Sequence, residues 1–238
     1  MQKRTEMRFG LVAAFYSIYL FLALADSFAE YFTGGVTDEP AWAFFYYFTN
    51  QSNLFVLVWL SLFAYGRLRT KETWAGRVTL SRKIWTGAVL YMTVVFVIVQ
   101  TILYPFYTGD FEVVPDGASL VTHVLSPFIV WAFYLLYPLQ GRATNKTVLA
   151  WICYLWAYVA VVNVVGATQT WKGGKPAYCY DFLNPGGYPN IWVYLLVIAA
   201  LSVAVYLVGL GVVRAKTLFD WGSAEAVEVE SPTREAKR

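Results

Sequence analysis

The chain has 238 residues, of which 58% are hydrophobic, 19% aromatic and only 14% charged. Soluble domains are roughly 45–50% apolar and about 25% charged, so this composition excludes an ordinary soluble domain and also a disordered chain. A net charge of only +3 excludes a nucleic-acid-binding protein, and two cysteines with one histidine exclude a disulfide scaffold and a zinc or iron–sulfur centre. A multi-pass membrane protein without a metal ion or another cofactor is the class that remains.

Six apolar stretches have about the 20 residues that are needed to cross roughly 30 Å of hydrocarbon. In chain order they cover residues 9–32, 43–65, 84–104, 119–139, 148–167 and 190–212. We expect each stretch to form a helix, so that residues 1–216 make one all-α membrane domain, a bundle of six transmembrane helices. The polar residues 217–238 are expected to form a disordered tail.

Basic residues are distributed unequally between the segments that join these spans. Sixteen lysines and arginines fall at the N-terminus, in the second and fourth loops and after the last span, whereas the other loops contain only Lys172 and Lys175. The positive-inside rule then predicts a cell-membrane protein with both termini in the cytoplasm. Cys179 is then expected to react with an impermeant thiol reagent from outside, unless it is buried in its loop. We expect no cleavage of the first span as a signal peptide, because its apolar run is longer than a usual signal-peptide core.

Polar side chains inside the spans gather in one layer. Polar groups are costly in hydrocarbon and need a partner or a cavity. Thr49 and His123, like Asp26 and Asn163, lie four to six residues inside the expected outer boundary of their spans, about 6–9 Å deep at 1.5 Å per residue. Other polar residues of the second and third spans accompany them: Ser52, Asn53, Gln100 and Tyr104. Because the inner halves hold almost none, we expect a polar pocket that opens to the outer face.

Each of these polar residues also has a structural interpretation. Hydroxyl groups such as that of Ser52 can donate to the carbonyl four residues earlier in a helix. The amides of Asn53, Gln100 and Asn163 can join neighbouring helices by hydrogen bonds. Glu30, one turn beyond Asp26, is expected at the level of the lipid headgroups. Both interpretations stay open at this point.

The residues of this layer are those that acyl-transfer chemistry uses. A threonine or serine hydroxyl attacks an ester carbonyl, a histidine removes its proton, an acid or amide orients the histidine, and asparagine donors stabilise the oxyanion. His123 lies beside a hydroxyl-rich helix start, and Pro127 is expected to bend the helix just after it. Two alternatives remain: a small-solute or proton-coupled transporter, which the apolar inner halves disfavour, and a non-enzymatic lipid-binding membrane protein.

Three motifs resemble the six-helix family of androgen-induced protein and androgen-dependent TFPI-regulating protein. They are FTNQSNL at 48–54, a histidine followed by Pro-Phe at 123–128, and the aromatic segment YDFLNP at 180–185. That family is known for membrane threonine hydrolases that cleave fatty acid esters of hydroxy fatty acids. The resemblance implies that Thr49 is the nucleophile, His123 the base and a membrane lipid ester the substrate. The spacing from histidine to proline is one residue shorter here than in the animal members.

Ser52 is the alternative nucleophile on the same helix face. Thr49 lies one turn nearer the outer surface and closer to the expected depth of His123. Ser52 would have to draw an ester carbonyl about 4.5 Å deeper, at 1.5 Å per residue. We therefore expect Thr49 to carry the reaction.

Overall fold

In this computed structural model the protein is built from helices, and the described residues contain no β-strand. The structure describes residues 2–33, 39–69, 72–103, 117–171 and 174–230. The long helices are α1 (Gln2–Thr33), α2 (Phe48–Leu68), α4 (Arg82–Ile98), α7 (Ser126–Leu136), α8 (Asn145–Thr168) and α9 (Ile191–Glu230). Short helical turns are η1 (Ala41–Phe45), α3 (Trp74–Val78), α6 (Gly117–Leu120), η4 (Asp181–Leu183) and η5 (Pro185–Gly187). Two π-helical turns, η2 (Val99–Leu103) and η3 (Val121–Leu125), extend α4 and join α6 to α7.

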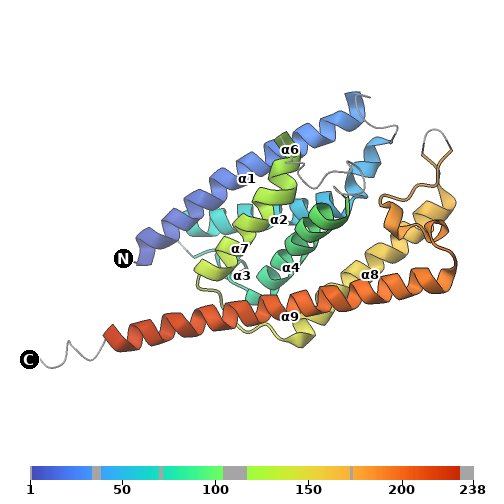
Figure 1. Ribbon diagram of the computed structural model, residues 1–238. Coiled ribbons are helices and arrows are strands. Elements are labelled where there is room, and N and C mark those ends of the chain that lie inside the picture. Colours follow the sequence, from blue (N-terminus) through green and yellow to red (C-terminus); the bar gives the residue numbers. More distant parts are fainter. Residues whose placement is uncertain (1, 34–38, 70–71, 104–116, 172–173, 231–238) are drawn as a thin grey trace, which may run out of the picture.

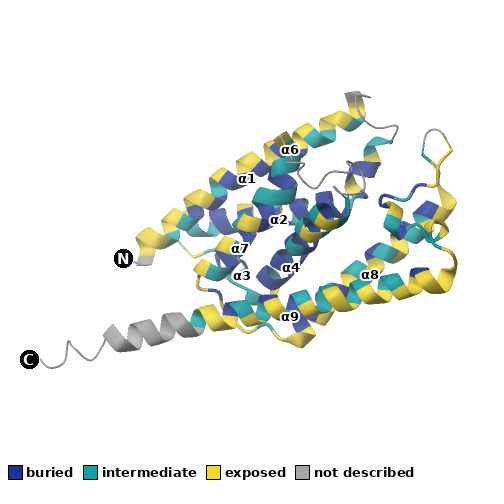
Figure 2. Cartoon of the chain, viewed as in Figure 1, coloured by how far each residue is buried: buried dark blue, intermediate teal, exposed yellow. Residues whose placement is uncertain are grey.

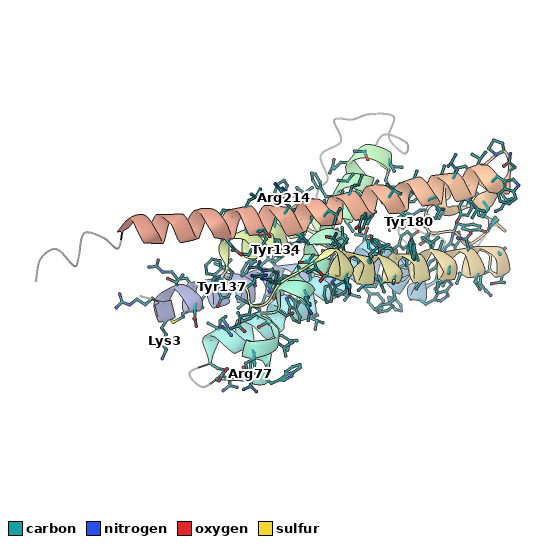
Figure 3. All side chains as sticks on the ribbon, turned by 90° about the horizontal axis from the view of Figure 1, so that it is seen from below. Lys3, Arg77, Tyr134, Tyr137, Tyr180 and Arg214 are labelled. Carbon is teal, nitrogen blue, oxygen red and sulfur yellow. The ribbon has the colours of Figure 1, made fainter. Side chains whose placement is uncertain are left out.

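Successive long helices run in alternate directions, so both chain termini lie at one end of the bundle (Figure 1). The closest pairing is between α1 and α2, and α4 occupies the centre, where it contacts α2, α7, α8 and α9. Basic residues such as Lys3 and Arg77 lie toward the end with the termini, and Tyr180 lies toward the opposite end (Figure 3).

The burial pattern is that of a bundle with an apolar exterior. All side chains of α4 from Trp85 to Met92 are buried, whereas α8 and α9 expose large apolar residues such as Val164, Trp192 and Leu196 (Figure 2). Exposed apolar surface of this extent marks a surface that contacts lipid or another protein.

Five segments of the described chain are long and apolar enough to cross a membrane. They are Lys3–Phe32, Arg82–Leu103, Gly117–Leu136, Asn145–Thr168 and Ile191–Asp220. The predicted all-α class is therefore confirmed, with several helices suited to a multi-pass membrane protein, and five of the expected spans correspond to these segments.

The second expected span, residues 43–65, differs from the observed structure. A 3₁₀ turn occupies Ala41–Phe45, and the α-helix begins only at Phe48. The helix α2 is not among the five apolar segments, because its first turns carry the polar run from Thr49 to Asn53, which lowers the mean hydropathy.

The last helix is longer than expected. Residues 217–230, which we expected to be disordered, continue α9, while residues 231–238 lie outside the described part. The buried Lys216 anchors the helix here, because its Nζ donates to the carbonyls of Leu135 at 3.1 Å and Tyr137 at 3.0 Å. Its ammonium also pairs with Asp220 at 2.8 Å, and Asp220 pairs in turn with Arg82 of α4.

Aromatic rings fill the end of the bundle that carries the termini. Phe63 lies edge-on to Trp85 and Tyr137, with ring centroids 5.8 Å and 4.8 Å apart, and Trp85 stacks on Phe133 at 5.8 Å. Phe9 of α1 packs edge-on to Phe133 at 5.6 Å. Such ring pairs stabilise a densely packed core. The helices are thereby held together at one end, and the polar residues meet at the other.

Candidate active site

A cavity of about 490 Å³ lies at the end of the bundle away from the termini. Its walls come from the end of α1, the start of α2, the α6–η3 segment and the loop before α9, and its lining includes Asp26, Glu30, Thr49, Asn50, His123 and Tyr180. Because most of these side chains carry polar atoms, we call this space the polar cavity.

The polar cavity brings together three of the residues that the sequence singled out. Asp26 reaches it from α1, Thr49 from the first turn of α2, and His123 from η3. Glu30, expected among the headgroups, lines the same space one turn beyond Asp26, and both carboxylates are on exposed residues. Three of the four residues that share the expected depth therefore line one cavity, and the fourth, Asn163, does not.

Four other predicted site residues do not line the polar cavity. Ser52 and Asn53 are buried in the packing of α2, and the Ser52 hydroxyl has no hydrogen-bond partner among the described residues. Gln100 lies in η2, outside the cavity lining. Asn163 joins two helices, because its Nδ2 donates to the hydroxyl of Tyr194 on α9 at 2.6 Å. The remaining predicted residue, Tyr104, lies outside the described part of the chain.

Contacts at Nδ1 fix the orientation of the His123 ring. This nitrogen lies 3.0 Å from the carbonyl oxygen of Ser119 and 3.0 Å from the hydroxyl of the same residue. Because a carbonyl oxygen only accepts, Nδ1 carries the proton in the bond to it, and Nε2 of the neutral ring is then an acceptor. This is the proton arrangement that a general base needs. The orienting group is a backbone carbonyl, where we expected an acid or amide side chain.

A π-helical turn surrounds His123. The N–H of Ser126 donates to the carbonyl of Val121, five residues earlier, and the next residue, Pro127, has no N–H to donate. Wide turns of this kind occur often at functional sites. The helix is distorted near Pro127 as expected, but the distortion includes His123 and precedes the proline.

Asn53 connects the start of α2 to this turn. The residue is fully buried, and its Nδ2 donates to the carbonyl of Thr49 at 2.9 Å and to that of Thr122 at 3.0 Å. The two bonds use both protons of the amide nitrogen, so Asn53 holds two backbone segments and offers no donor to the polar cavity. Its role is therefore to position the residues on either side of the cavity.

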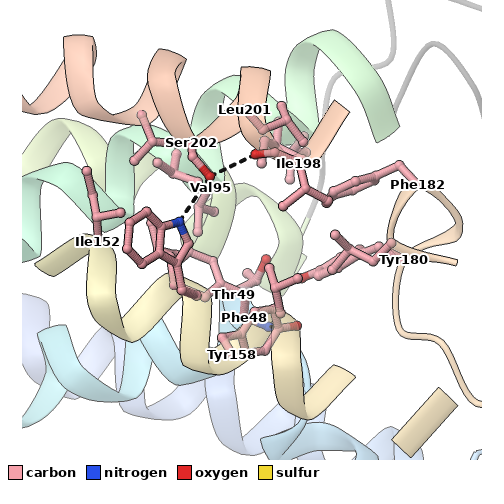
Figure 4. Close-up of a pocket in the computed structure, with 18 of the residues that line it drawn as sticks. Phe48, Thr49, Val95, Ile152, Tyr158, Tyr180, Phe182, Ile198, Leu201 and Ser202 are labelled. Atoms are coloured by element: carbon pink, nitrogen blue, oxygen red, sulfur yellow. Dashed lines mark hydrogen bonds between the residues drawn. The ribbon is translucent and has the colours of Figure 1, made fainter. Parts of the chain in front are cut away.

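Tyr180 is the residue of this site that sequence reasoning missed. The Tyr180 side chain lines the polar cavity together with Thr49, and it reaches toward Thr49 from the loop before α9 (Figure 4). Burial raises the pKa of Tyr180, so the hydroxyl stays protonated and able to donate at neutral pH. The one signal for it in the sequence is its place at the start of the YDFLNP motif.

The neighbouring Cys179 is unsuited to chemistry. Burial raises the pKa of its thiol to about 12, and its Sγ lies 3.1 Å from the hydroxyl of Tyr158. A buried, protonated thiol is a poor nucleophile. Because Cys179 is buried in its loop, it meets the condition under which no reaction with an external thiol reagent is expected.

A second pocket, of about 100 Å³, adjoins the polar cavity between α2, α4, α8 and α9. Aliphatic side chains dominate its lining, so we call it the apolar pocket. The hydroxyl of Ser202 in its wall accepts a hydrogen bond from Trp156 Nε1 at 3.0 Å and donates one to the carbonyl of Ile198 at 2.7 Å (Figure 4). These polar atoms are thus paired with each other, so a molecule bound in the pocket does not have to supply them with a hydrogen-bond partner.

Among the described residues, no group of three or more histidine, cysteine and acidic side chains is placed to hold a metal ion. Comparisons with protein-family models, curated proteins and solved structures found no match to this chain. The residues around Thr49 and His123 therefore carry the functional interpretation.

Proposed function

We propose that this protein is an intramembrane hydrolase of lipid esters, with Thr49 as the nucleophile and His123 as the general base. One observation carries the proposal: a single cavity is lined by the Thr49 side chain, by a histidine whose Nδ1 faces a carbonyl, and by the Tyr180 side chain beside Thr49. Ser52 is outside this cavity, which favours Thr49 over the alternative nucleophile.

We further infer that α2 is a sixth span. Its 21 residues are about 30 Å long at 1.5 Å per residue, which matches the hydrocarbon thickness. It packs between α1 and α4, so its polar first turns face the protein interior, where polar groups are tolerated. With six spans, the basic residues at the end that carries the termini favour a cytoplasmic location for that end in the cell membrane. The polar cavity then opens to the outer face.

The reaction proceeds in two steps at this site. Nε2 of His123 takes the hydroxyl proton as Oγ of Thr49 attacks the ester carbonyl carbon, and the Tyr180 hydroxyl donates to the oxygen that becomes negative. The bond from this carbon to the alcohol oxygen then breaks, and the alcohol leaves with the proton from His123. Water from the polar cavity next attacks the acyl-threonine, again losing its proton to His123. The second breakdown returns that proton to Thr49 and releases the carboxylic acid.

The same geometry disfavours a transporter. A transport path has to continue from one face to the other, whereas the rings of Phe63, Trp85 and Phe133 fill the opposite end of the bundle. The apolar pocket favours, as a second candidate, a lipid-binding protein without enzymatic activity.

Turnover measurements separate these functions. Purified protein in nanodiscs is incubated with a p-nitrophenyl acyl ester, and the wild type is compared with His123→Ala and with the matched control Ser52→Ala. A hydrolase loses its activity in His123→Ala and keeps it in Ser52→Ala. Equal release of p-nitrophenol by the wild type and His123→Ala, with both proteins folded, would contradict the proposal.

A further inference from the structure

We propose that the apolar pocket holds the acyl chain of the ester, while the polar cavity holds the alcohol part and the hydrolytic water. This inference rests on the proposed function and assigns the two halves of the substrate to the two sides of Thr49. It identifies the substrate class as esters with an extended, unbranched apolar chain next to the carbonyl.

The two spaces meet at the proposed nucleophile. Thr49, Leu103 and Tyr180 line both of them. The carbonyl carbon of an ester lies between the acyl chain and the alcohol oxygen. A nucleophile at a junction of two spaces therefore suits a substrate that extends into both.

The chemistry of each space determines which half of the ester it takes. His123 lines the polar cavity and is absent from the lining of the apolar pocket. The alcohol has to receive its proton from His123, so its oxygen lies on the polar side of Thr49. The deacylating water, which gives its proton to His123, has to enter from the same side. The acyl chain is left for the apolar side, where aliphatic residues such as Val95, Ile152 and Leu201 surround it.

The apolar pocket also has a direction. Its lining runs from Val159 to Ile152 on α8 and from Ile198 to Val205 on α9. Seven residues of helix correspond to about 10 Å. The pocket therefore extends from Thr49 toward the middle of the bundle, parallel to the direction of lipid chains in the bilayer, and its depth limits how much of a chain is enclosed.

Chain-length profiles of two opposite variants test the assignment. The kcat/KM values are measured for p-nitrophenyl acetate, butyrate, octanoate and dodecanoate. Leu201→Trp narrows the pocket from the half-buried side of α9, and we expect the octanoate-to-acetate ratio of kcat/KM to fall at least tenfold. Ile152→Ala deepens the pocket, and we expect the dodecanoate-to-octanoate ratio to rise. Leu195→Trp, at an exposed position of α9 outside the pocket, is the matched control and keeps the wild-type profile.

Photocrosslinking separates failure of this inference from failure of the proposed function. An octanoyl ester with a diazirine at the chain end is bound to Thr49→Ala protein and irradiated, and we expect adducts on residues of the apolar pocket such as Ile152. Adducts on Asp26 or Ser119, or chain-length ratios unchanged in both pocket variants, would overturn the inference while hydrolysis itself stood. Adducts in the apolar pocket of a protein that hydrolyses none of the esters would support the chain site and contradict the enzymatic function.

Discussion

Asn53 and Thr122 are joined by a hydrogen bond of 3.0 Å from Nδ2 of the amide to the backbone carbonyl oxygen. The helix itself supplies no donor to this carbonyl. The N–H of Ser126 donates to the carbonyl of Val121, and Pro127 has no N–H. The same Nδ2 donates to the carbonyl of Thr49 at 2.9 Å. One buried amide therefore connects the backbone of the proposed nucleophile with the residue next to the proposed base.

Replacement of this amide tests the connection. In Asn53→Leu the Thr122 carbonyl loses its donor, and a buried unpaired polar group costs about 1–3 kcal/mol of stability. We expect a lower midpoint of thermal unfolding and a fall in kcat that exceeds any change in KM. Asn163→Leu is the matched control, because it removes the bond to Tyr194 outside the polar cavity. A kcat as high in Asn53→Leu as in the control would show that Asn53 does not position the site.

Removal of the Tyr180 hydroxyl tests its role as an oxyanion donor. Tyr180→Phe keeps the ring that separates the two spaces and removes the donor beside Thr49. Loss of one such donor lowers kcat by about 10²–10³ in enzymes that use this stabilisation, and we expect a decrease of that order with little change in KM. Tyr188→Phe, which removes a hydrogen bond of 2.7 Å to the Phe182 carbonyl in the same loop, provides the comparison. Equal rates in the two variants would assign Tyr180 a packing role.

Cysteine accessibility in intact cells tests the proposed orientation. Cys179 is unsuitable as a reporter because it is buried and its thiol has a pKa of about 12. In a Cys153→Ser background, we expect Lys175→Cys, at an exposed position of the loop before α9, to react with an impermeant maleimide. Arg142→Cys, exposed between α7 and α8, is expected to react only after permeabilisation. The reverse pattern would place the polar cavity on the cytoplasmic side.

The sequence predicted the all-α class and five of the apolar helices, because both depend only on positions along the chain, and it assigned several polar side chains to one expected depth. It did not predict which neighbours those side chains face, since that depends on the rotation of each helix in the bundle. Asn163 therefore shares the expected depth of Thr49 but bonds to Tyr194, outside the polar cavity. Tyr180 reaches the site from a loop between helices, and no periodic pattern marks such a contact. At the π-helical turn around His123, the Asn53 amide donates to the Thr122 carbonyl, a bond between segments far apart in the sequence.

The most direct test of Thr49 as nucleophile is the position of a covalent adduct. A fluorophosphonate probe forms a bond from phosphorus to the attacking oxygen, releases fluoride and leaves the hydroxyl proton on His123. Fragment spectra of the labelled peptide distinguish Thr49 from Ser52, because Asn50 and Gln51 lie between them. We predict an adduct at position 49 that forms in the wild type, in Thr49→Ser and in Ser52→Ala, and that is lost in Thr49→Ala and His123→Ala. An adduct on Ser52, or undiminished labelling of Thr49→Ala, would contradict the assignment of Thr49.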